Sequence, residues 1–281
     1  MSAPFFDVPL SAHLPRLRET LADLITVLDK ALGPVRRFRK TDDAVENPLR
    51  LAAGMHALNA LDAARAVHNL SGTDYAQTLT PHFRTLFEVM VKMRAMRNDP
   101  KRARAYLESE PFERHAMATE RVRKGKHWAG IIQDCKDAVA KNPALLQLPK
   151  VNTGKNNPPN FTAVARGLRM DLETLAEELG MDEEDYLMDF AVPSLAPHTS
   201  PVYTKTFGMS INADGTATMS SDIDPKLLLI YVIRSSARVG QILEDVLALF
   251  PDGPLQFEAE KIEPRLEEQT VALQNLVGKK P

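Results

Sequence analysis

The chain has 281 residues, a formal net charge of −2, 44% hydrophobic residues and 26% charged residues, which is typical of a globular protein with a large core. Its single cysteine, Cys135, excludes an intramolecular disulfide and indicates a buried thiol in a reducing compartment. The longest apolar run, residues 227–233, is too short to span a membrane, and Asp7 and two prolines interrupt any leader sequence. We therefore expect a cytoplasmic protein that has no membrane partner.

Helical spacing of apolar residues predicts five helices in the first half of the chain, over residues 11–32, 48–70, 80–98, 100–124 and 128–141. Gly33 and Pro34 end the first helix, and Asn47 is the expected N-cap of the second, before Pro48. Thr80 and Pro81 open the third in the same way.

The second half begins with a proline- and asparagine-rich loop or lid over residues 142–160, followed by short helices up to residue 190. Residues 203–221 are rich in β-forming residues around Asn212-Ala-Asp-Gly215 and predict a β-hairpin. A long helix over 225–250 and an amphipathic helix over 256–276 follow. The last helix packs on a partner subunit to form a homo-oligomer, or else covers its own bundle.

These elements predict a mainly α fold, a multi-helix bundle with one small β-hairpin at about 203–221. We expect three parts: residues 1–46 as a helix and basic linker, residues 47–250 as the helical core domain with the loop and hairpin, and residues 251–281 as a C-terminal helix and tail.

Charge is divided unevenly along the chain. Residues 1–140 contain 22 lysines and arginines against 17 acidic residues, whereas residues 141–281 contain 13 against 20. A basic N-terminal half, including Arg36, Arg37, Arg39 and Lys40, favours a nucleic-acid partner. The alternative is that each half simply has a solvent-exposed surface, one positively and one negatively charged, which explains the same numbers of basic and acidic residues.

The helix predicted over 80–98 carries Arg84 and Glu88 one turn apart at the edge of its apolar face. The order arginine then glutamate stabilises a helix less than the reverse order does. The pair is therefore either a simple boundary ion pair or part of a polar site.

A second polar segment follows about a hundred residues later, as Tyr186-x3-Phe190-x3-Ser194-x3-His198. Pro193 and Pro197 cannot continue a helix, so Ser194 and His198 are expected on a constrained non-helical segment. Such a segment can present a histidine for acid/base chemistry. A capping serine and a surface histidine are the alternative.

Several familiar chemistries lack their motifs. There is no Gly-x-Ser-x-Gly elbow, no His-Glu-x-x-His or cysteine pair, and no glycine-rich phosphate loop, so we expect no resident metal or cofactor. Two segments, Arg50-x5-His56 and Arg121-x5-His127, match the Arg-x4-6-His pattern of HEPN ribonucleases. Chance produces one or two such matches in a chain with this many arginines and histidines.

Taken together, the segments resemble an uncharacterised bacterial family, a domain of unknown function found in helical proteins of this size. The resemblance runs over residues 50–250, from Ala57-Leu-Asn-Ala-Leu through Arg84-x3-Glu88 and Asp99-Pro100 to the Tyr186 segment. It implies a shared polar site formed by Arg84, Glu88, Tyr186, Ser194 and His198. Phe190 stands where a tyrosine is more usual in that family, so it brings no hydroxyl group.

Three functional hypotheses remain open. In the first, the polar site binds a small anion through Arg84 or uses His198 for acid/base chemistry, assisted by Ser194 and Tyr186. In the second, the chain is a non-enzymatic interaction, stress or defence protein whose polar cluster only fixes the fold. In the third, it is a HEPN-like ribonuclease or another nucleic-acid-binding protein.

Overall fold

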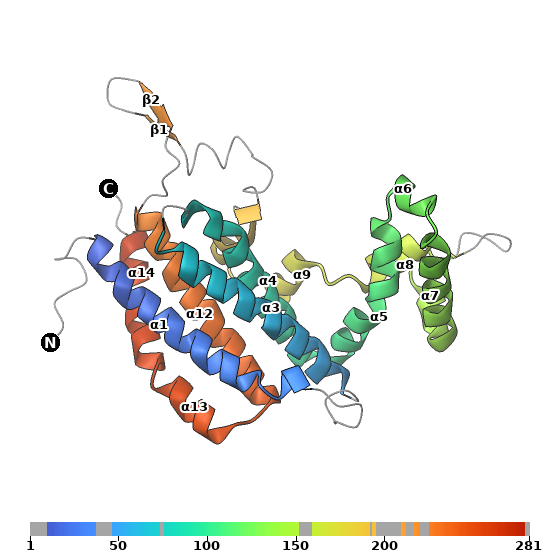
Figure 1. Cartoon of the computed structure of the whole chain (residues 1–281), viewed down its shortest axis with the longest axis horizontal. Coiled ribbons are helices and arrows are strands. Elements are labelled where there is room, and N and C mark those ends of the chain that lie inside the picture. Colours follow the sequence, from blue (N-terminus) through green and yellow to red (C-terminus); the bar gives the residue numbers. More distant parts are fainter. Residues whose placement is uncertain are drawn as a thin grey trace. The chain divides into compact units, whose positions relative to one another are not determined.

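The computed structural model describes residues 10–37, 47–73, 76–151, 159–191, 193–194, 209–211, 216–219 and 225–278. Side chains are described over the same ranges except at residues 10–11, 37, 76–77, 209–211, 217–219 and 273–278. Helices dominate this part of the chain, which confirms the mainly α fold (Figure 1). None of the described helices is long and apolar enough to cross a membrane.

The chain forms two compact units. Unit 1 contains residues 1–97 and 172–281, and unit 2 contains residues 98–171. The helical elements of unit 1 are α1 (Leu10–Ala31), η1 (Val35–Arg37), α3 (Pro48–Leu70), η2 (Ala76–Leu79), α4 (Thr80–Asn98), α9 (Leu172–Glu178), α10 (Glu183–Tyr186), η4 (Leu187–Ala191), α12 (Pro225–Leu249), α13 (Gly253–Glu260) and α14 (Glu263–Gly278).

Unit 1 is built around α12, the most apolar long helix. The buried face of α1 consists of leucines spaced three or four residues apart, Leu17, Leu21, Leu24 and Leu28, and this face packs along α12 and α3. Figure 1 shows α1, α3 and α12 running side by side. The N-terminal helix therefore belongs to the main core, and the structure divides the chain differently from the predicted boundaries at residues 46 and 250.

The C-terminal segment also returns to this core. It forms two helices, α13 and α14, where the sequence predicted one helix over 256–276. The break falls at Lys261 and Ile262 because Pro264 cannot continue a helix from the preceding turn. Both helices pack on α12 and α1 of the same chain.

Several helix boundaries follow local chemistry. The Asn47 side chain accepts hydrogen bonds from the backbone of Leu49 and Arg50, as expected for the N-cap of α3. Helix α9 is closed by Gly180, two residues after its end, whose φ of 68° allows the N–H of Met181 to reach the carbonyl of Ala176. Asp182 then caps α10 directly, so the turn between the two helices is very short.

Unit 2 has its own core of Phe112, Cys135, Leu145, Val151, Phe161 and Val164. Its elements are α5 (Pro100–Met117), α6 (Glu120–Arg123), α7 (Trp128–Lys141), η3 (Pro143–Gln147) and α8 (Phe161–Leu168). The helix predicted over 100–124 therefore ends seven residues early and is followed by the separate single turn α6. The predicted loop 142–160 contributes η3 and the buried Val151, and residues 152–158 lie outside the described part.

Of the segment 203–221, the structure describes two three-residue strands and Thr216. Strands β1 (Met209–Ile211) and β2 (Ala217–Met219) pair antiparallel, with Ser210 opposite Thr218. The remainder of the predicted hairpin lies outside the described residues.

Candidate functional site

Four of the five predicted site residues are described, and three of them gather around one aromatic ring. The guanidinium carbon of Arg84 lies 4.6 Å from the ring centroid of Phe190. The Tyr186 ring centroid lies 5.4 Å from the same ring, and the Ser194 hydroxyl donates to the backbone carbonyl of Phe190. The structure therefore brings α4 together with the segment 186–194. His198 lies outside the described residues.

The local geometry of 183–194 explains this gathering. After one α-helical turn, residues Leu187–Ala191 form the π-helical turn η4, whose hydrogen-bonded loop is one residue longer than that of an α-helix. Tyr186 and Phe190 both contact Phe87 of α4, at centroid distances of 6.2 and 6.3 Å. An aromatic contact thus holds this short element against α4.

Arg84 and Glu88 do not form the ion pair that their spacing allows. The Glu88 carboxylate instead accepts from Lys92 at 2.5 Å, one turn further along α4. Glutamate four residues before lysine is the favourable order on a helix, and Arg84 is held instead by its stack on Phe190. Among the described residues, Arg84 has no carboxylate within ion-pair distance, and its Nε is buried without a hydrogen-bond partner.

A buried histidine borders Glu88 and Lys92. His56 of α3 is 5% exposed. Burial, and to a smaller extent the charge of Lys92, lower its pKa to about 4, and the charge of Glu88 partly opposes the shift. His56 is therefore neutral at pH 7. Its residue partner in the Arg-x5-His pattern, Arg50, lies over the ring of Phe250 at 5.8 Å.

A buried arginine–aspartate network, which the sequence motifs did not predict, lies beside these residues. Asp189 of η4 is fully buried, and its carboxylate accepts from Arg234 at 2.6 Å and from Arg238 at 2.5 Å. Asp185 accepts from Arg234 at 2.8 Å. Both arginines belong to α12, so two acids one turn apart meet two arginines one turn apart.

Electrostatics differ between the two acids. Burial raises the pKa of the Asp189 carboxyl, against the opposing charges of Arg238 and Arg234. For the half-buried Asp185, burial acts in the same direction, but the two arginines outweigh it and hold the pKa below its ordinary value. The charges of the network balance, because each carboxylate pairs with an arginine and each arginine with a carboxylate, and Arg234 Nε is buried without a hydrogen-bond partner.

A sequence signal for this network exists. Arg234 and Arg238 interrupt the long apolar helix α12 at i, i+4 spacing, and Gln241 and Asp245 continue the same stripe. A buried arginine requires a carboxylate partner. Asp185 and Asp189 have the matching spacing.

The site offers anchoring groups for an anion rather than for a metal. No group of three histidine, cysteine, aspartate or glutamate side chains suited to a metal ion occurs within the described ranges. Around the site, Lys92 pairs with Glu88, and Arg234 and Arg238 pair with Asp185 and Asp189. The unmatched positive charge is that of Arg84.

Comparison with known proteins gives one match. The model of a family of unknown function, DUF5677, matches residues 50–212, which is more than half of the chain. This stretch includes Arg84, Glu88, Tyr186 and Ser194. The chain matches no curated protein and no solved structure significantly.

Proposed function

Because the chain belongs to the family of unknown function DUF5677, as the sequence resemblance predicted, we propose its function from the geometry of the site: it binds a small anion at Arg84. The observation that carries this proposal is the state of Arg84. Its guanidinium is stacked on Phe190 and partly buried, and no carboxylate of the described residues neutralises it. A fixed guanidinium presents paired N–H donors that suit phosphate or carboxylate oxygens.

The surrounding residues support this role by positioning. Phe190 fixes the plane of the Arg84 guanidinium, and Phe87 and Tyr186 fix Phe190. The arginine–aspartate network holds η4 on α12. Lys92 adds positive charge near the site while Glu88 restrains its side chain. In this proposal His198 keeps its predicted acid/base role as a separate prediction.

Binding of inorganic phosphate and of succinate, measured by calorimetry at constant ionic strength, tests the proposal. Arg84→Gln is expected to weaken binding of the preferred anion at least tenfold. Arg84→Lys should weaken it less, because lysine keeps the positive charge but lacks the paired N–H donors and the planar group that lies over the Phe190 ring. Phe190→Leu should weaken binding with the charge unchanged. Arg104→Gln, at an arginine exposed on α5, is the matched control.

Two results would contradict the proposal. One is equal binding by wild type and Arg84→Gln. The other is equal weakening by Arg84→Gln and Arg104→Gln, which would mean that the protein attracts anions only through its overall charge.

A second candidate function is nucleic-acid binding, and the favouring observation concerns unit 2. Residues 98–171 contain 14 lysines and arginines against 8 acidic residues. The exposed side chains Arg121, Arg123, Lys124 and Lys126 follow one another on α6 and the next turn. Arg123 also lies over the ring of Trp128, at 5.6 Å. A phosphate backbone contacts such exposed cations.

The basic residues of α1 and α4 support this role less, because many of them pair with acids of the second half. Examples are Arg16 with Glu268, Lys30 with Glu258 and Arg97 with Asp245. A gel-shift titration of single-stranded RNA at several salt concentrations tests unit 2. We expect the triple variant Arg121→Gln/Arg123→Gln/Lys126→Gln to bind more weakly and with a smaller salt dependence. An unchanged titration would exclude this surface.

A further inference from the structure

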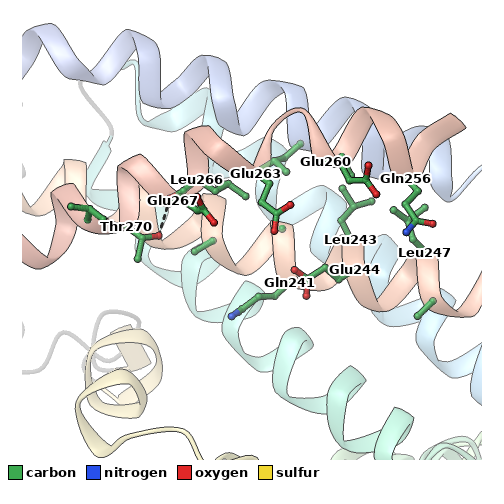
Figure 2. Close-up of a pocket in the computed structure, with 16 residues that line it drawn as sticks. Gln241, Leu243, Glu244, Leu247, Gln256, Glu260, Glu263, Leu266, Glu267 and Thr270 are labelled. Carbon is green, nitrogen blue, oxygen red and sulfur yellow. Dashed lines mark hydrogen bonds between the residues drawn. The ribbon is translucent and has the colours of Figure 1, made fainter. Parts of the chain in front are cut away.

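A groove lies on unit 1 between α12 on one side and α13 and α14 on the other (Figure 2). Its volume is about 770 Å³, which is within the range of sites for small molecules. Helices α12 and α14 approach closely at one point, because a Cβ added to Gly240 would lie 3.0 Å from Leu266 Cδ1. Along α12 the groove is lined from Ala237 to Ala248.

The groove has an apolar floor. Leu24 of α1 and Leu243 of α12 are buried in it, and Leu247 and Leu266 are partly exposed. Alanines complete the surface at both ends. Methylene groups of a ligand that lie on this floor would be removed from water. Their burial would favour binding by about 25 cal/mol of free energy per Å² of apolar surface covered.

Four carboxylates border this floor. Figure 2 shows Glu260, Glu263 and Glu267 on α13 and α14, with Glu244 of α12 across the groove from them. Glu244 is 3.3 Å from Arg94. For Glu260, Glu263 and Glu267, no cation of the described residues lies within ion-pair distance. The rim therefore offers negative charge that this part of the chain does not neutralise.

The spacing of the charges indicates the shape of the ligand. Glu263 and Glu267 are one turn apart, which places their Cβ atoms roughly 5–6 Å from each other. Glu260 precedes Glu263 across the break between the helices. Ammonium groups separated by three or four methylenes have a similar spacing. The stretch of α12 from Ala237 to Ala248 is roughly 16 Å long at 1.5 Å per residue.

We propose that this groove binds a linear aliphatic polyamine, whose ammonium groups contact the glutamates while its methylene segments lie on the leucine floor. Such a molecule alternates positively charged groups with apolar methylene segments. The groove likewise places carboxylates on its rim beside an apolar floor. A second copy of this chain fits less well, because a twofold contact through the groove would bring glutamates against glutamates.

Calorimetric titration of the full chain with spermine, spermidine and putrescine at low ionic strength tests the proposal. Affinity is expected to rise with the number of ammonium groups. The triple variant Glu260→Gln/Glu263→Gln/Glu267→Gln should bind spermine at least tenfold more weakly. Its control is Glu173→Gln/Glu177→Gln/Glu184→Gln, which removes the same charge from exposed positions on α9 and α10.

A steric variant separates the groove from its charge. Ala248→Trp keeps all four glutamates and fills one end of the groove, so spermine binding should fall at least fivefold while putrescine binding changes less. Circular dichroism confirms that each variant is folded. The proposal is overturned if the two triple variants weaken spermine binding equally, or if Ala248→Trp leaves it unchanged.

Two other occupants would also be revealed. A helical peptide with leucines at i, i+3, i+4 and i+7 and lysines on the opposite face, labelled with fluorescein, is titrated in parallel. Tighter binding of this peptide than of spermine at the groove overturns the proposal in favour of a basic protein partner. Sedimentation velocity detects a second copy, and a dimer that the glutamine variant dissociates would likewise overturn it.

Discussion

Asp189 and Arg238 form a two-point contact between segments 49 residues apart: the Asp189 Oδ2 accepts from Nε at 2.8 Å and from Nη2 at 2.5 Å. Both side chains are buried, and Arg238 also lies over the Phe87 ring at 5.6 Å. This contact links η4, α12 and α4. The position of Phe190, and through it that of Arg84, depends on it.

Replacing Asp189 by asparagine should destabilise the protein by about 3–5 kcal/mol, because it leaves two buried arginines without their central carboxylate. Urea denaturation followed by circular dichroism measures the loss. Asp185→Asn is the control and should cost less, since the Asp185 side chain is 33% exposed and Asp189 remains. Equal losses for the two variants would mean that Asp189 is not the centre of the network.

His56 should make stability depend on pH. Its pKa is about 4 in the folded chain and near 6.5 in the unfolded chain, so between these values the unfolded state binds more protons. Stability is therefore complete above about pH 6.5 and is lost as the pH falls towards 4. From pH 7 to pH 5 the loss from this group is about 2 kcal/mol. The fall should be smaller by that amount in His56→Leu, measured by urea denaturation, and an identical fall in both proteins would refute the assignment.

Cys135 should be unreactive in the folded protein. Burial raises the pKa of its thiol to about 11, and the thiol donates to the backbone carbonyl of Pro111. At pH 8 only about one thiol in a thousand is ionised at such a pKa. A disulfide reagent such as Ellman's should therefore react with one equivalent of thiol in urea and with almost none in buffer. Rapid reaction without denaturant would show that unit 2 opens readily.

Two glycines within helices should respond oppositely to alanine. A Cβ at Gly130 of α7 has no heavy atom within 4 Å, so Gly130→Ala should stabilise unit 2 by about 0.5–1 kcal/mol through helix propensity. Fluorescence of Trp128, the single tryptophan, follows the unfolding of unit 2.

At Gly54 of α3 the added Cβ would lie 2.6 Å from Val35 Cγ1, a branched side chain with little freedom. Gly54→Ala should therefore destabilise unit 1 by about 1–3 kcal/mol despite the better propensity. Circular dichroism in urea measures the change. Stabilisation by this substitution would show that η1 moves aside without cost.

The sequence predicted what local chemistry decides. The N-cap of α3 at Asn47, the start of α4 at Thr80 and the leucine face of α1 follow from caps and periodicity, and the structure confirms them. The break at Pro264 is also local and was missed, because periodicity continues across it.

The partners of the polar residues depend on tertiary packing. The neighbourhood of Arg84 and Phe190 was predicted from the family resemblance, but the spacing of Arg84 and Glu88 alone suggested the wrong pair. Glu88 has one cation four residues before it, Arg84, and another four residues after it, Lys92. Because Arg84 lies over the Phe190 ring of η4, Glu88 pairs with Lys92. The Asp189 network forms only when α12 packs against η4. No local sequence pattern predicts that contact between segments far apart in the chain.

The order of elements has a consequence for synthesis on the ribosome. Unit 2 is continuous in sequence and can fold as soon as residues 98–171 have emerged. By contrast, α1 packs against α12, which begins at Pro225, so at about 5–20 residues per second it waits roughly 10–40 seconds for its partner. During that interval the leucine face of α1 has no partner from α12. The nascent chain is then a substrate for chaperones, and silent codon changes that slow translation after residue 171 should lower the yield of native protein.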